Sequence, residues 1–319
     1  MIITTPTPFQ QAIAVAQQKG LLPSTLSSAQ LSRLESQLKR RAVFSARMNS
    51  ASVLSVLQKN LEQIVSGMGI ESESGRLRSI PEAKAQLKEA MFAAGVRIAP
   101  VGTPKINDFY SDARRELMVR TTVLDTLGFG RHVAGQDQVA LDVNPAWELI
   151  RMVEPKGGDA AKRPWHERWK AAMDDIGSDA DGGCTDPDED DGRMVALKNH
   201  PIWQALGDGA GGYDDSLGNP WPPFAFNSGM NVIDVPRREC AALGIMNENE
   251  RVEPDTSFDM NENLEASVTK FDAAMQKALN GGGLKVVKGI LKIANSHRYR
   301  RASMIRAKVK GLCKLREAA

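Results

Sequence analysis

Hydrophobic side chains recur at intervals of three and four along the first hundred residues, which is the spacing of one face of an α-helix. Four such stretches stand between residues that open, cap or end helices. They are residues 8–20, the segment that follows Ser27 or Ser28 with Leu31, Leu34 and Leu38, residues 53–67, and residues 81–95. The pattern predicts a helical N-terminal half in which short connections join packed helices.

Two further helices are predicted in the middle of the chain. From about Asn107 the apolar residues continue at helical spacing, although Gly128 and Gly130 weaken the later turns, because glycine disfavours a helix interior. Trp165 and Trp169 stand four residues apart, so they share one face of a second helix.

The same region carries the pattern of a small sheet. Residues 143–153 partly alternate between apolar and polar side chains, and residues 193–197 form a second short apolar run that can pair with them. We therefore expect an α+β fold. We divide the chain into a helical domain over 1–105, an α+β domain over 106–245, and a linker with a basic tail over 246–319.

The stretch 193–244 mixes large aromatic rings with prolines and glycines. Proline removes backbone donors and clashes with a continuing helix, so the mixture suits neither a helix nor a central strand. Many large rings are also unsuited to a disordered linker. We expect an ordered irregular loop that its aromatic residues pin onto a small core, with a role in catalysis, ligand capture or docking. The residues that organise this loop are Trp203, Trp221, Pro222, Pro223, Phe224, Phe226 and Asn227.

The last part of the chain changes in composition. Residues 246–262 are rich in Asn, Glu and Asp and have no apolar period, which predicts a linker. A modest helix over 271–278 precedes three glycines. Beyond them Val286, Val287, Ile290, Leu291 and Ile293 are interspersed with Lys285, Lys288 and Lys292, and this pattern predicts a basic amphipathic helix in the tail.

The formal net charge of +2 hides a strong asymmetry, since residues 174–191 are heavily acidic and almost every charged residue in 285–316 is positive. A dense basic surface attracts a phosphate backbone without reading its sequence, and it can equally engage an anionic membrane or an acidic protein face. It can also serve only as a solvated surface. The docking candidates are Lys285, Lys288, Lys292, Arg298, Arg300, Arg301, Arg306, Lys308 and Lys310.

The cysteines stand at positions 184, 240 and 313, an odd and scattered set without a C-x-x-C spacing. This arrangement argues against a disulfide framework and a zinc site, and it is typical of free thiols in a reducing compartment. No apolar run approaches the roughly 20 residues of a membrane-spanning helix. The first residues also lack the basic start of a signal peptide. We expect a cytoplasmic protein that has no membrane contact.

Candidate catalytic motifs fail on their spacing. The acidic segment that starts at Asp186 has Leu197 where the calcium loop of an EF-hand needs a bidentate glutamate. The glycines of 207–212 lack the lysine and the following helix of a phosphate-binding loop. His166 and Glu167 lie beside two tryptophans, but the histidines show no metal-binding spacing. We expect no catalytic residues, no metal and no cofactor.

Four segments resemble, in order, the phage Mu F-like minor head domain. They are Asp112-Ala-Arg-Arg-Glu-Leu-Met-Val-Arg-Thr-Thr, Pro145-Ala-Trp-Glu-Leu-Ile-Arg-Met-Val, Pro201-Ile-Trp-Gln-Ala-Leu-Gly, and Pro222-Pro223 ahead of Asn227-Ser-Gly-Met. The resemblance covers residues 107–244. Two positions depart from it, since Thr122 stands where glutamate is common, and Phe224-Ala-Phe-Asn-Ser-Gly-Met replaces an ending rich in Cys and His. A metal or thiol role of that ending therefore does not carry over.

The resemblance implies a phage virion structural protein that acts in head morphogenesis and in DNA packaging or ejection. Its implied partners are the portal and other head proteins, with the basic tail touching packaged DNA or an acidic portal face. Its implied place is the capsid near the portal, after assembly in the host cytoplasm. Two alternatives stay open. One is an enzyme or effector that uses a Trp/His/Asn pocket around His166, His200 and Asn227, and the other is a sequence-nonspecific nucleic-acid-binding protein.

Overall fold

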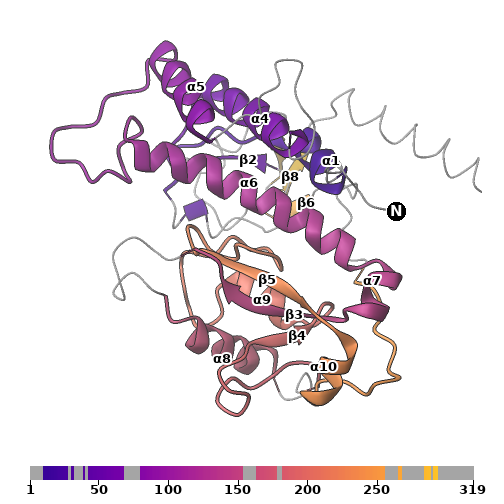
Figure 1. Cartoon of the computed structure of the whole chain (residues 1–319). Helices are drawn as coiled ribbons and strands as arrows, with labels where there is room; N and C mark the ends of the chain where they lie inside the picture. Colours follow the sequence, from indigo (N-terminus) through magenta and orange to yellow (C-terminus); the bar gives the residue numbers. More distant parts are fainter. Residues whose placement is uncertain are drawn as a thin grey trace, which may run out of the picture.

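The computed structural model describes residues 10–27, 30–31, 39, 42–67, 80–153, 163–177, 182–255, 265–267, 284–288 and 290–293. The predictions for Pro8, for the helix over 271–278 and for the tail beyond 293 lie outside the described residues. Among the described ones, the expected α+β fold is confirmed. A helical unit lies above a small sheet with its own short helices, and the long helix α6 crosses between the two parts (Figure 1).

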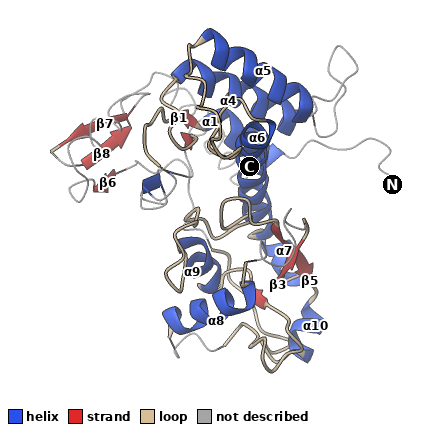
Figure 2. Ribbon diagram, turned by 90° about the vertical axis from the view of Figure 1, so that its left-hand side faces the viewer, coloured by secondary structure: helices blue, strands red, loops and turns tan. Residues whose placement is uncertain are grey.

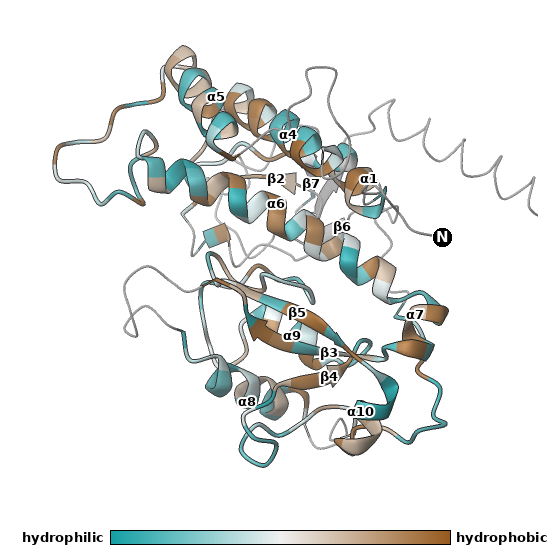
Figure 3. Ribbon diagram, in the orientation of Figure 1, coloured by the Kyte–Doolittle hydropathy of each residue, from teal (hydrophilic) through white to brown (hydrophobic). Residues whose placement is uncertain are grey.

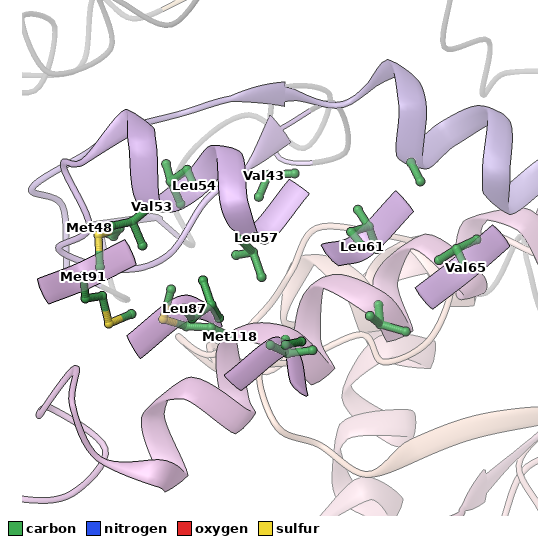
Figure 4. Close-up of a cluster of buried hydrophobic side chains, with 14 of the residues drawn as sticks. Val43, Met48, Val53, Leu54, Leu57, Leu61, Val65, Leu87, Met91 and Met118 are labelled. Atoms are coloured by element: carbon green, nitrogen blue, oxygen red, sulfur yellow. The ribbon is translucent and has the colours of Figure 1, made fainter. Parts of the chain in front are cut away.

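The helical unit consists of α1 (Gln10–Gln18), α4 (Ala51–Ser66), α5 (Ile80–Ala93) and the first half of α6 (Asp112–Gly135). Their apolar faces form one core, of which Figure 4 shows the part around α4, α5 and Met118. Serine side chains cap two of these helices, since Ser50 accepts from the amide of Val53 and Ser111 accepts from that of Arg114. The helical reading of this half is confirmed for its described residues. It missed one small pairing, in which β1 (Gly20–Leu21) runs parallel to β2 (Ala42–Val43).

Helix α6 continues through the glycines that were expected to weaken it. It starts at Asp112, after the Ser111 cap, and its 24 residues include both Gly128 and Gly130. A β-carbon on Gly128 would lie 2.0 Å from the carbonyl oxygen of Pro222, so the absence of a side chain is what lets the double-proline segment approach the helix. The short helix α7 (Gln138–Val143) follows.

The sheet has strand order β4-β3-β5 and is antiparallel throughout. The predicted pairing of β3 (Ala146–Arg151) with β4 (Val195–Leu197) is confirmed, and the helix α8 (Trp165–Ile176) carries both expected tryptophans. The short helices α9 (Ile202–Asp208) and α10 (Arg237–Ala242) complete this part. In Figure 3 the strands β3 and β4 are predominantly hydrophobic, as expected for strands covered by neighbouring elements.

Two expectations for this region were wrong in detail. The stretch read as continuous loop contains a strand, β5 (Met230–Val235), which pairs along the whole of β3. Its apolar residues alternate only in part, and the run is short and stands between a glycine and a proline, so its pairing partner decides its structure. The start of the presumed linker also packs, because Met246 and Val252 are buried beside Cys240.

The prediction of a helix at the start of the basic tail is also wrong. Residues 284–287 form β7 and residues 290–293 form β8, an antiparallel hairpin with β6 (Glu265–Ser267) on its other edge. Lys288 lies at the turn with a φ of 51°, the left-handed conformation of tight hairpin turns. The β-branched residues that fitted a helical stripe fit a strand better. This sheet lies beside the helical unit, apart from β3–β5 (Figure 2).

The buried thiol of Cys240 yields a prediction about pH. Burial raises its pKa from 9.0 to about 11. The unfolded thiol therefore loses its proton at lower pH, so the contribution of this group to stability is complete below pH 9.0 and decreases up to about pH 11. At pH 8 we expect iodoacetamide to label the half-buried Cys184 well before Cys240, measured by peptide mass spectrometry. Unfolding in urea should equalise the two rates, and equal rates in the native protein would contradict the prediction.

Candidate functional site

The double-proline loop, residues 209–229, is an ordered structure held by its own backbone. The Pro222–Pro223 bond is cis, and Phe224 and Asn227 both have positive φ angles. The amide of Leu217 donates to the carbonyl of Phe224 at 2.8 Å, and the amide of Phe226 donates to that of Asp215 at 2.9 Å. These bonds close the loop on itself, so its two sides keep a defined separation.

One side of the loop enters the core of the sheet region. Phe224 is fully buried and stacks on Trp203 with ring centroids 5.9 Å apart. Trp203 in turn meets Trp147 of β3 at 6.0 Å and Trp169 of α8 at 5.5 Å, both edge to face. Such pairs each stabilise by roughly 0.5–1.5 kcal/mol beyond the burial of their area. The expectation that aromatic residues pin this loop is confirmed for Trp203, Trp221 and Phe224, whereas Phe226 is half-buried and Asn227 is exposed.

The other side of the loop packs on α6. The ring of Trp221 meets Phe129 edge to face at 4.8 Å and lies 5.3 Å from the ring of His132. Together with the close approach at Gly128, these contacts seat the loop along one face of the helix.

A buried carboxylate joins this contact to the N-terminal segment. Asp125 of α6 accepts from the Nδ2 of Asn219 at 2.5 Å and from the Nε1 of Trp221 at 3.2 Å through one oxygen. Its other oxygen binds the Nζ of Lys19, just after α1, at 2.5 Å. The Lys19 side chain is 3% exposed and that of Asp125 is 12% exposed. Asp125 therefore connects three segments that are far apart in the sequence.

A second ion-pair cluster anchors the outer part of the loop. Arg168 of α8 donates to both oxygens of Asp215, at 2.9 and 3.1 Å, and its guanidinium lies 3.8 Å from the ring centre of Tyr213. Arg163 adds an ion pair with Asp215 at 2.6 Å and donates to the carbonyl of Phe226. A planar guanidinium suits this combination of paired and stacked contacts. Both ends of the loop are therefore held by charged hydrogen bonds as well as by rings.

The residues of the alternative Trp/His/Asn pocket have separate surroundings. His166 is partly exposed, and its Nε2 lies 2.7 Å from Asp188 of the acidic segment. His200 is buried and its Nδ1 accepts from the amide of Ile202. Asn227 is exposed at the turn of the loop. His166 and His200 therefore have different hydrogen-bond partners.

The basic docking candidates are described only in part. Lys285 and Lys292 are register partners in the β7–β8 hairpin, and the exposed Lys288 is at its turn. The remaining candidates, from Arg298 to Lys310, lie outside the described residues. Sequence reasoning missed Lys19, Asp125 and Asn219. A signal for Asp125 did exist, since it lies three residues after Thr122 and four before Phe129, on the face of α6 that is buried.

Comparison of the chain with protein-family models, curated proteins and solved structures finds no significant match. Within the described part of the chain, no helix combines the length and apolar character needed to cross a membrane. The same residues contain no group of three or more His, Cys, Asp or Glu side chains that could hold a metal ion.

Proposed function

We propose that the protein is a structural component of a phage head, a minor head protein that docks at the portal and acts in head morphogenesis and DNA packaging or ejection. The observation that carries the proposal is that the four segments of the Mu F-like resemblance lie on elements that pack together. The first begins α6, and the second forms β3, whose Trp147 reaches the ring of His132 later in α6 and that of Trp203. The third forms α9, and the fourth belongs to the loop whose Trp221 donates to Asp125 of α6. The elements that carry the four segments thus form connected contacts.

An exposed apolar tip supports a docking role. The connection between α5 and α6 projects from the helical unit (Figure 1), and it carries side chains that a soluble protein gains nothing by exposing. Phe92, in the last turn of α5, is 78% exposed, and in the connection Ile98 is 73% exposed and Val101 is fully exposed. We assign this tip to the contact with the portal or another head protein, since apolar side chains at the centre of an interface supply much of its binding energy.

The basic tail supports a second contact within the head. The described hairpin brings Lys285 and Lys292 into register beside Lys288, and the sequence continues with further lysines and arginines. Such a charge density neutralises phosphates and releases counterions, whatever the DNA sequence. In this proposal the tail touches the packaged genome or an acidic portal face.

Quantitative mass spectrometry of purified phage particles tests the proposal. We expect a few copies per particle that co-isolate with the portal, in both empty and DNA-filled heads. Loss of the protein from portal complexes when Phe92, Ile98 and Val101 are changed to serine, with Val139→Ser as an exposed control on α7, would support the tip as the contact. Complete absence of the protein from particles and from their assembly intermediates would contradict a head function.

A further inference from the structure

A cavity of about 180 Å³ lies against α6, between the N-terminal segment and the double-proline loop. We call it the α6 cavity. Its lining side chains include Lys19, Lys39, Arg114, Asp125 and Asn219. Lys19 is paired with the carboxylate of Asp125, whereas Arg114 forms no ion pair with a described carboxylate. Buried charges are costly unless they are paired, so the buried guanidinium of Arg114 calls for an anion.

Arg114 is the residue that defines the chemistry of the cavity. It is 8% exposed, and its Nη2 donates only to neutral acceptors, the Ser45 hydroxyl at 2.9 Å and the Ala46 carbonyl at 2.7 Å. Its Nε is buried without a hydrogen-bond partner, and its Nη1 donates to no described residue. The guanidinium also lies 5.2 Å from the ring centre of Phe109. The Nη1 group of this charged side chain is thus left as a donor for a ligand.

The electrostatics of Arg114 agree with this view. Burial lowers the pKa of its guanidinium, and the nearby Arg47 lowers it further, because both disfavour the charged form. Lys19, in contrast, has a carboxylate partner in Asp125. The uncompensated cation of the cavity is therefore on the side of Ser45 and Arg114.

We propose that the α6 cavity binds a phosphate group, either free phosphate or a terminal phosphate monoester, with Arg114 as its principal ligand. A guanidinium fork matches the oxygens of a phosphate, and lysines supply further point charges around it. The cavity is far larger than a single water needs and is roomy enough for a small oxyanion. Binding there would add contacts between the N-terminal segment and the double-proline loop, both of which line it. The inference does not depend on the proposed head function.

Titration calorimetry of the full chain with inorganic phosphate, at ionic strength matched with chloride, tests the proposal. We expect saturable binding of one phosphate per chain. The variant Arg114→Gln should weaken binding at least tenfold, because it loses a charge-assisted pair. The matched control is Arg120→Gln, on the same helix but outside the cavity lining, and it should bind as the unchanged protein does. Absence of saturable binding, or equal binding by Arg114→Gln, would overturn the proposal.

A measurement on the unchanged protein covers the case in which Arg114→Gln does not fold. In protein with ¹⁵N-labelled arginine, phosphate should shift the Nε–H resonance of Arg114 and leave that of Arg120 in place. An unmoved Arg114 signal at saturating phosphate would overturn the proposal equally. Competition by a 5′-phosphorylated oligonucleotide, but not by its 5′-hydroxyl form, would identify a nucleic-acid end as the source. Displacement by neither would leave free phosphate as the ligand.

Discussion

Replacing Asp125 with asparagine is expected to lower the free energy of unfolding by about 3–5 kcal/mol, the usual cost of leaving one partner of a buried ion pair uncompensated. The change keeps the shape of the side chain but leaves the Lys19 ammonium, which is 3% exposed, without its carboxylate. It also weakens the acceptor that Asn219 and Trp221 share. Equilibrium unfolding in urea measures the loss.

The matched control is Asp112→Asn on the same helix. The Asp112 side chain is 67% exposed, and an exposed ion pair contributes roughly 0–1 kcal/mol, so this variant should be nearly neutral. In the double variant Lys19→Met, Asp125→Leu, both charges are removed, and the loss should be smaller than the sum of the two single losses. A loss below about 1 kcal/mol for Asp125→Asn alone would show that the pair is solvated rather than buried.

Replacing Gly128 with alanine is expected to destabilise the protein by about 1–3 kcal/mol, the usual cost of overpacking a well-packed site. The sign of this change in stability is informative, because alanine inside a helix normally stabilises by about 0.5–1 kcal/mol relative to glycine. Here the new β-carbon would lie 2.0 Å from the Pro222 carbonyl oxygen and 3.0 Å from the Trp221 ring. The loop must then move away from α6, and thermal unfolding would report the loss.

Gly182→Ala provides the comparison for Gly128→Ala. An added β-carbon at Gly182 meets no atom within 4 Å, so this variant should be close to neutral. Stabilisation by Gly128→Ala would mean that the double-proline loop does not rest on the helix. A change in the tryptophan fluorescence that reports the surroundings of Trp221 in the same variant would locate the disturbance at the contact between loop and helix.

The local sequence pattern predicted the secondary structure correctly where an element is long enough to show one period. The apolar spacing of α4 and α5 predicted both helices, since a stripe that repeats over four turns fits only one period. The short runs of the tail fit two periods equally well. Residues 284–293 read as a helix, but their β-branched side chains and the turn at Lys288 made a hairpin. Short elements depend on a partner strand, which no local pattern contains.

The candidate site divides in the same way. The aromatic residues of the double-proline loop were recognisable because large rings among prolines have few alternatives to burial. Asp125 was not recognised, because a single carboxylate in a helix ordinarily faces solvent. Its partners lie 94, 96 and 106 residues away in the chain. The α6 cavity could not be predicted for the same reason, because its lining comes from three segments that are far apart in the sequence.

By itself, the sequence determined the α+β composition, the course of the long helices and the burial of the ring-bearing loop, because periodicity and ring size act over a few neighbouring residues. Only the tertiary structure decided which strand completes the sheet, why Gly128 has no side chain, and where Lys19, Arg114 and Asp125 meet. Those outcomes depend on contacts between distant segments. The free-energy cost of burying a charge or an added methyl group depends on the residues that pack against it, and the local sequence does not show which residues these are.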